Sequence, residues 1–324
     1  MALALGTAVN VSAKTVELNY ATFFPVTHKH TVLVQEWAKE VEKRTNGAVK
    51  VTIFAGATLT PADQTYDSVT KGIADIGMSV ASYSKGRFPL SEVIDLPLGY
   101  SLGSQATHLA NAYMQKFQPK EFSDTKVMYV HAHGPGILHT KKPVKSLEDL
   151  KGMKIRCTGT SAKVLKELGA LPVAMPMTET YDALQKGVVE GFVAPKEALQ
   201  GFKLGEVVKY TTENYGSSYS LLFWVAMNKQ KWDSLPKDVQ ATIEKINVEW
   251  IEKSGKVWDE IEKGGADFGA SKGMQTIKLT PAEDARWSAE SKDVIAEYVT
   301  TTKAKGLPGD EALKFCQDWL KKNK

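Results

Sequence analysis

Residues 152–195 read GMKIRCTGTSAKVLKELGALPVAMPMTETYDALQKGVVEGFVAP, and this stretch decides the fold. It predicts a short strand over residues 154–157 that carries Arg156, then a glycine turn, a helix from Ser161 and an amphipathic helix over residues 178–186. An arginine at a strand end, before a helix N-terminus, is well placed to hold an anion, because its guanidinium grips a carboxylate through two parallel bonds. A surface arginine in an ordinary βα turn fits the same pattern.

Strand and helix patterns alternate along the rest of the chain. The expected strands are residues 16–22, 49–54, 74–78, 127–139, 154–157, 172–175 and 217–228. The expected helices are residues 31–44, one opened by Thr60 and Pro61, then 161–168, 178–186, 236–268, 281–301 and 309–322. This alternation predicts an α/β fold, with a mostly parallel sheet covered by helices on both faces.

Four more segments carry a family pattern in the same order. They read WAKEVEKRTNGAVKVTIFAGATL (37–59), VTKGIADIGMS (69–79), GRFPLSEVIDLPLGY (86–100) and VAMNKQKWDSLPKDVQ (225–240). Together with residues 151–195 they resemble the extracytoplasmic solute-binding subunits of TRAP transporters (tripartite ATP-independent periplasmic transporters), the DctP-type family. The resemblance spans about residues 15–270. It implies a two-lobe, Venus-flytrap architecture of the periplasmic-binding-protein type, with mixed sheets, hinge strands and a long bracing helix.

The resemblance also implies a division of the chain. Lobe I takes residues 14–130, with 226–250 returning to it, and lobe II takes 131–225 with parts of 251–324; hinge strands lie near 127–139 and 217–228. Residues 1–13 are apolar and uncharged and end in Val11-Ser12-Ala13, which is typical of a signal-peptide remnant. A disordered tail is the alternative. The signal-peptide interpretation predicts a periplasmic protein.

Arg156 matches the family arginine that pairs with a ligand carboxylate, so the resemblance implies an organic anion as ligand. Where sialate-binding members hold polar groups, this chain has four residues without a side-chain partner for a hydroxyl: Phe23, Val80, Gly136 and Ala194. An unpaired buried hydroxyl costs about 1–3 kcal/mol, so these positions favour a monocarboxylate with an apolar or aromatic body. A C4-dicarboxylate or a sugar acid is the alternative ligand.

The candidate ligand-binding residues follow from the resemblance and from the expected carboxyl ends of the strands. They are Arg156, Phe23, His28, Tyr83, His133, Gly136, Met175, Pro176, Ala194, Tyr219 and Trp224. Phe23, Phe24, Tyr83, Tyr219 and Trp224 could form aromatic walls, although Trp224 also fits a core residue in a buried strand.

His131 and His133 stand two residues apart on an extended segment and therefore share a face. They are expected to be hydrogen-bond donors that face the cleft, or structural histidines. A zinc-assisted hydrolase centred on them is the alternative from another class, since an HxH pair can be half of a zinc site. The sequence contains no HExxH motif, so it assigns no catalytic residue, metal ligand or cofactor.

Composition excludes several other classes. The net charge is only +4 and lysines alternate with glutamates on the expected helices, which argues against a nucleic-acid partner. Cys157 and Cys316 are far apart, which favours two free buried thiols over a disulfide. The expected partners are a small organic anion and, as the resemblance implies, the small and large integral membrane subunits of a TRAP transporter. We expect a monomer.

Overall fold

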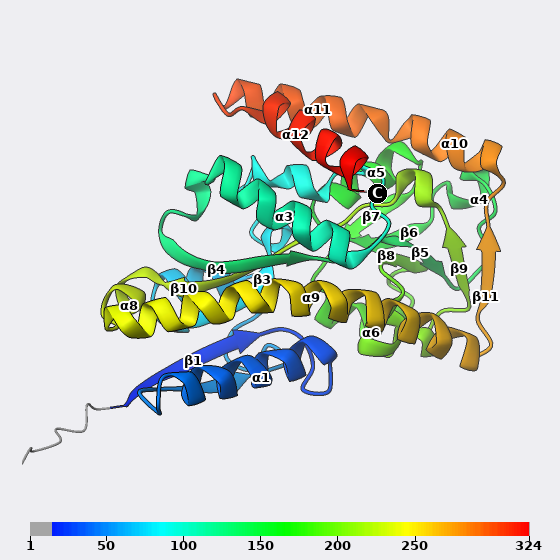
Figure 1. Cartoon of the computed structure of the whole chain (residues 1–324). Coiled ribbons are helices and arrows are strands. Elements are labelled where there is room, and N and C mark those ends of the chain that lie inside the picture. The colour runs from blue at the N-terminus through cyan, green and yellow to red at the C-terminus, as the bar shows by residue number, and fades with distance from the viewer. Residues whose placement is uncertain (1–14, 324) are drawn as a thin grey trace, which may run out of the picture.

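The computed structural model describes residues 15–323, and two sheets organise this part of the chain (Figure 1). The strands are β1 (Val16–Thr22), β2 (Val49–Phe54), β3 (Ile76–Val80), β4 (Thr125–Ala132), β5 (Ile137–Thr140), β6 (Lys154–Cys157), β7 (Leu171–Ala174), β8 (Gly191–Ala194), β9 (Tyr210–Glu213), β10 (Leu222–Asn228) and β11 (Gln275–Lys278). The first sheet has the order β2-β1-β3-β10-β4, and the second has the order β11-β9-β5-β8-β6-β7.

Both sheets are mixed, as the family resemblance implies. In the first sheet β1 is parallel to β2 and β3, whereas β10 is antiparallel to β3 and β4. In the second sheet β6 is parallel to β7 and β8, and β5 is antiparallel to β8 and β9. The chain crosses between the sheets at residues 133–136 and again between β9 and β10. Gly136 and Tyr219 join these two crossing segments, because the Gly136 N–H donates to the Tyr219 carbonyl at 2.7 Å.

Helices cover both sheets, and one of them spans the molecule. They are α1 (Lys29–Arg44), α2 (Thr65–Thr70), α3 (Gly103–Phe117), α4 (Leu147–Leu150), α5 (Thr160–Glu167), α6 (Met177–Gln185), α7 (Glu197–Gly201), α8 (Lys229–Asp233), α9 (Lys237–Ser271), α10 (Pro281–Glu290), α11 (Lys292–Ala304) and α12 (Gly309–Lys322). Figure 1 shows α9 running along the molecule, and it packs on α1, α3 and β4 of one half and on α7 of the other. It is the long bracing helix that the resemblance implies.

The contact face of α9 is apolar and closely packed. Ile243, Ile246, Trp250 and Trp258 recur at helical spacing and are buried, as a core-facing helix requires. At Gly255 the helix approaches α3 so closely that an added Cβ would lie 2.9 Å from a backbone atom of that helix. This packing fixes the frame against which the strand ends are positioned.

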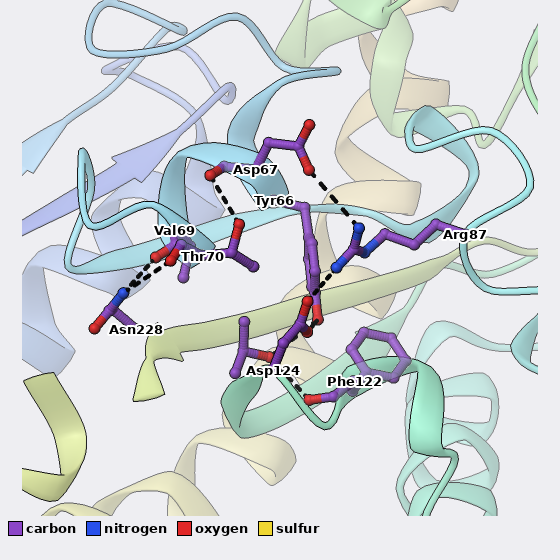
Figure 2. A network of polar contacts seen from close by, with 9 residues as sticks. Tyr66, Asp67, Val69, Thr70, Arg87, Phe122, Asp124 and Asn228 are labelled. Atoms are coloured by element: carbon purple, nitrogen blue, oxygen red, sulfur yellow. Dashed lines mark hydrogen bonds and ion pairs between the residues drawn. The ribbon is translucent and has the colours of Figure 1, made fainter. Parts of the chain in front are cut away.

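A polar network holds the outer part of the first sheet together (Figure 2). The Arg87 guanidinium lies over the Tyr66 ring, 4.4 Å from its centroid, and forms ion pairs with Asp124 and, at 3.8 Å, with Asp67. The Tyr66 hydroxyl also donates to Asp124 at 2.7 Å. The cation therefore has two carboxylate partners within the chain, although its Nε is buried without a hydrogen-bond partner, and it ties α2 to the start of β4.

Three predicted element boundaries are wrong. Thr60 and Pro61 do not open a helix: the Pro61 carbonyl accepts bonds from Gln64 and Thr65 in a turn, and α2 begins only at Thr65. The helix expected at 281–301 is two helices. The Ser291 hydroxyl donates to the Ser288 carbonyl, and Ser291 lies where α10 ends and α11 begins.

The strand expected from residue 217 begins at Leu222 instead. A short 3₁₀ turn occupies Tyr215–Ser217, where the Asn214 side chain donates to the Ser217 hydroxyl. The thiols of Cys157 and Cys316 are free and buried, as expected. The predicted signal-peptide remnant at residues 1–13 lies outside the described residues.

Candidate ligand-binding site

A cavity lies where the ends of β1, β3, β6, β8 and β10 meet, between the two sheets. The volume open to the centre of a water-sized sphere is about 20 Å³. Elements of the first sheet and crossing segments contribute Phe23, Phe24, Val80, Tyr83, His133, Tyr219, Leu221 and Phe223. The second half contributes Arg156, Met177, Ala194, Pro195, Glu197 and Phe202. The ends of β1, β3, β6 and β8 that meet here are carboxyl ends, which the sequence analysis expected for the first three, whereas β10 contributes its amino end and the end of β7 does not line the cavity.

Arg156 is the buried cation of the cavity. Its side chain is 1% exposed, and its Nε donates to the Met175 carbonyl at 3.0 Å. Its Nη2 is buried without a hydrogen-bond partner, and no ion pair between residues 15 and 323 involves this guanidinium. An unpaired buried charge costs several kcal/mol. The described residues supply no anion for this guanidinium, so the site requires one from a ligand.

Two tyrosines flank this guanidinium with their hydroxyls already engaged. The Tyr83 hydroxyl accepts a bond from the Met177 N–H at 2.9 Å, and the Tyr219 hydroxyl donates to the Val193 carbonyl at 2.9 Å. Burial raises the pKa of both tyrosines, while the Arg156 charge opposes that rise. Both are therefore neutral phenols, and neither supplies the missing anion.

Aromatic rings form the wall on the side of the first sheet. Phe23 stacks on Phe24 at a centroid distance of 4.5 Å, and lies nearly parallel to Phe223 at 6.3 Å and to Phe202 at 6.4 Å. Tyr83 meets Phe23 edge-on at 5.6 Å. Stacked and edge-on rings of this kind favour a flat apolar guest, because aromatic pairs gain from both geometries.

His133 is 1% exposed and lines the same cavity. Its Nδ1 lies 2.5 Å from the Gly134 carbonyl, and its Nε2 is buried without a partner. Burial, opposed by the bond to the Gly134 carbonyl and aided by the Arg156 charge, lowers the pKa of His133 to about 4. The ring is therefore neutral near pH 7, so it adds no second cation to the cavity.

The two halves touch around the cavity. The Thr158 hydroxyl donates to the Ser82 hydroxyl at 3.2 Å, and His28 Nε2 lies 2.9 Å from a Glu197 carboxylate oxygen. Gly159, at φ 52°, permits the first contact, because an added Cβ would lie 2.4 Å from the Ser82 Cβ. These contacts, with the bond between Tyr83 and Met177, enclose Arg156.

Five of the predicted residues lie elsewhere. Met175 and Pro176 border a neighbouring depression that shares Tyr83 with the cavity, and His28 lines a surface depression on the far side of Glu197. Gly136 lies behind Tyr219, where an added Cβ would be 2.5 Å from a ring atom. It therefore makes room for the tyrosine ring, not for a ligand as the sequence analysis proposed.

Trp224 is buried in the core of the first half, edge-on to Tyr66 at 5.1 Å, and does not line the cavity. Side chains alternate along a strand, and Phe223 occupies the cavity side of β10, so Trp224 must face the opposite side. The prediction selected the wrong one of two adjacent aromatic residues.

Sequence analysis missed Glu197 and Phe202 on or beside α7. Both follow β8, and the candidate residue Ala194 at the end of that strand was a signal that could have found them. Glu197 is 4% exposed and is held by His28. Its N–H also donates to Glu262 at 3.3 Å, and burial raises the pKa of Glu262 to about 7.

The geometry does not favour the zinc-hydrolase alternative. His131 is committed to the core: its Nδ1 accepts from Trp258 Nε1 at 2.9 Å and its Nε2 faces the Met78 sulfur at 3.3 Å. Across residues 15–323, no group of three or more His, Cys, Asp and Glu side chains could hold a metal ion. In the same residues, no helix is long and apolar enough to cross a bilayer.

Two α/β halves around an aromatic cavity with one buried guanidinium define a solute-binding protein, and comparisons agree. The family model described as bacterial extracellular solute-binding protein, family 7 (DctP) matches residues 21–301. This chain belongs to that family, the solute-binding proteins of TRAP transporters, as the sequence resemblance indicated.

Solved structures of this family superpose closely on most of the chain. A TRAP periplasmic solute-binding protein from Desulfovibrio salexigens, an open complex, is 36% identical over 94% of this chain and 96% of its own, with a TM-score of 0.82. One from Rhodoferax ferrireducens, with copurified benzoate, is 28% identical over 95% and 98%, with a TM-score of 0.90. A marine metagenome protein specific for aromatic acid ligands, with metahydroxyphenylacetate, is 30% identical over 95% and 99%, also at 0.90. The fold is therefore the two-lobe fold of these proteins.

Proposed function

We propose that this protein is a periplasmic receptor that delivers a monocarboxylate with an aromatic or apolar body to a TRAP transporter. One observation carries the proposal: the Arg156 guanidinium is 1% exposed, has an unpartnered Nη2 and lies beside aromatic walls. A ligand carboxylate removes the cost of that unpaired charge. The benzoate and metahydroxyphenylacetate bound by two similar proteins support the same ligand class.

Other anions fit the cavity less well. A C4-dicarboxylate would bring a second negative charge, and the cavity presents the Glu197 carboxylate where a second cation would be needed. A sugar acid would bury several hydroxyls against Phe23, Phe24, Val80 and Phe223, and each unpaired hydroxyl costs about 1–3 kcal/mol.

Closure of the lobes is the proposed mode of action. Residues 14–130 with 226–250 form one lobe and residues 131–225 with parts of 251–324 the other, with the crossings near 127–139 and 217–228 as the hinge; β10 joins the first sheet already from Leu222. A ligand that touches Phe23 and Arg156 together binds the closed state more tightly than the open state, and this difference drives closure. The closed monomer then docks on the small and large membrane subunits, without catalysing a reaction.

Calorimetric titration of the full chain tests this proposal with matched probes. We expect benzoate and phenylacetate to bind more tightly than succinate or galacturonate, and we expect benzamide, which has the ring without the charge, not to bind. Tighter binding of succinate or galacturonate would assign another ligand class. Equal binding of benzamide and benzoate would remove Arg156 from the mechanism.

A further inference from the structure

The cavity contains a second polar atom without a partner, besides the Arg156 Nη2. It is Nε2 of His133, which is buried and makes no hydrogen bond. The other polar side chains that line the cavity have partners: the Tyr83 hydroxyl accepts from the Met177 N–H and keeps its own proton available, the Tyr219 hydroxyl donates to the Val193 carbonyl, and Glu197 contacts His28. The described side chains of the cavity therefore leave this nitrogen for the ligand.

The hydrogen bond at the other ring nitrogen decides what Nε2 can do. A carbonyl oxygen can only accept, so the 2.5 Å contact with the Gly134 carbonyl places the proton on His133 Nδ1. A neutral imidazole with its proton on Nδ1 has a lone pair on Nε2. Burial and the Arg156 charge keep the ring neutral, since its pKa is lowered to about 4. Sequence analysis expected a donor here, whereas the geometry makes this atom an acceptor.

We infer that His133 is a specificity-determining residue, whose Nε2 accepts a hydrogen bond from a hydroxyl or N–H group on the body of the carboxylate ligand. The inference rests on the proposed function and deepens it. The cavity presents an unpartnered donor at Arg156 and an unpartnered acceptor at His133, in an otherwise apolar lining. The ligand class that satisfies both is a hydroxylated aromatic acid, because a site with a buried acceptor discriminates against analogues that leave it unpaired.

Binding measurements with matched aromatic acids test the inference. The probes are benzoate, the three hydroxybenzoate isomers and the three methoxybenzoates, which keep the oxygen and lose the donor. We expect at least one hydroxybenzoate to bind the full-length wild-type chain about tenfold more tightly than its methoxy counterpart. In His133→Phe we expect this ratio to fall to about one, because phenylalanine has no acceptor atom. His133→Gln, which keeps an acceptor oxygen, should retain part of the preference.

A second readout does not depend on these variants folding. In ¹⁵N NMR spectra of the wild type at pH 7, His133 Nε2 should appear as an unprotonated nitrogen and should shift toward a hydrogen-bonded value when the preferred hydroxybenzoate is added. A protonated Nε2, or methoxybenzoates that bind as tightly as every hydroxybenzoate, would overturn the inference while benzoate binding still upholds the proposed function. If no aromatic acid binds, the proposed function fails and the inference fails with it.

Discussion

Arg87 and Arg156 show how a structural charge differs from a charge that requires a ligand. Arg87, with its side chain 34% exposed, lies over Tyr66 and pairs with Asp67 and Asp124 (Figure 2). Arg156 is 1% exposed, bonds the Met175 carbonyl and has no carboxylate partner among the described residues. Arg87 has two carboxylate partners, whereas Arg156 has none among residues 15–323. This missing carboxylate, more than burial alone, supports the proposed assignment of Arg156 to a binding site.

Two histidines repeat this contrast. His139 is fully buried and both of its ring nitrogens are engaged, Nδ1 with Thr211 at 2.9 Å and Nε2 with the Ala194 carbonyl at 3.2 Å. His133 is as deeply buried, but only its Nδ1 is engaged. Of these two buried histidines, only the one with an unpartnered nitrogen, His133, lines the cavity.

The largest expected effect is at Arg156. Arg156→Ala should weaken benzoate binding by about 3–5 kcal/mol, because the bound carboxylate would be buried without its strong partner. The same variant should not lower the melting temperature of the ligand-free protein, since it removes a charge that the chain leaves unpaired. Titration calorimetry and thermal unfolding measure the two quantities.

Arg87→Ala is the matched control for that comparison. It removes an arginine side chain that pairs with two carboxylates of the chain. It should therefore lower the melting temperature and change the benzoate dissociation constant less than twofold. A loss of less than tenfold in Arg156→Ala, about 1.4 kcal/mol, would contradict the assignment of Arg156 to the site.

His139 should control acid stability without affecting binding. Burial lowers its pKa to about 3 from the usual 6.5, so the folded state binds fewer protons than the unfolded state between these values. Its contribution is thus complete above pH 6.5 and is lost as the pH falls toward 3. Relative to His139→Gln, the wild type should lose about 2 kcal/mol of unfolding free energy from pH 6.5 to 4.5. Urea titrations at both pH values measure this difference; an equal offset at both pH values would show that folding does not lower the pKa of His139.

The smallest effect is expected at the contact between the halves. Tyr83→Phe removes the acceptor of the Met177 N–H and should weaken benzoate binding about fivefold, because a closed state with an unpaired N–H is less stable. Tyr181→Phe on α6, the helix that begins at Met177, is the control. The Tyr181 hydroxyl contacts only Glu206, at 3.5 Å near the surface. Equal affinities of the two variants would separate Tyr83 from closure.

Local patterns in the sequence predict most elements and the central arginine. The alternation of strands and helices, and the position of Arg156 at a strand end, depend on neighbouring residues and are correct. Pairing across the fold is not visible locally: His28 and Glu197 are 169 residues apart, and nothing near either indicates the other.

The sequence also does not show toward which face of the sheet each aromatic residue of a fully buried strand points. All seven residues of β10 are buried, so periodicity gives no sign that Phe223 faces the cavity and Trp224 the core. The sequence analysis selected Gly136 as a position that makes room for a ligand, but the space that this glycine leaves is filled by the Tyr219 ring.

The hydrogen bond between the Gly136 N–H and the Tyr219 carbonyl joins the two segments that cross between the sheets, and Tyr219 also lines the cavity. In the proposed closing motion, a ligand in contact with the Tyr219 ring would act directly on a segment that crosses between the two sheets. The proposal therefore needs no relay of residues between the ligand and this crossing. Any substitution that enlarges or reduces the space over the Tyr219 ring should change both the closure of the two halves and the ligand specificity.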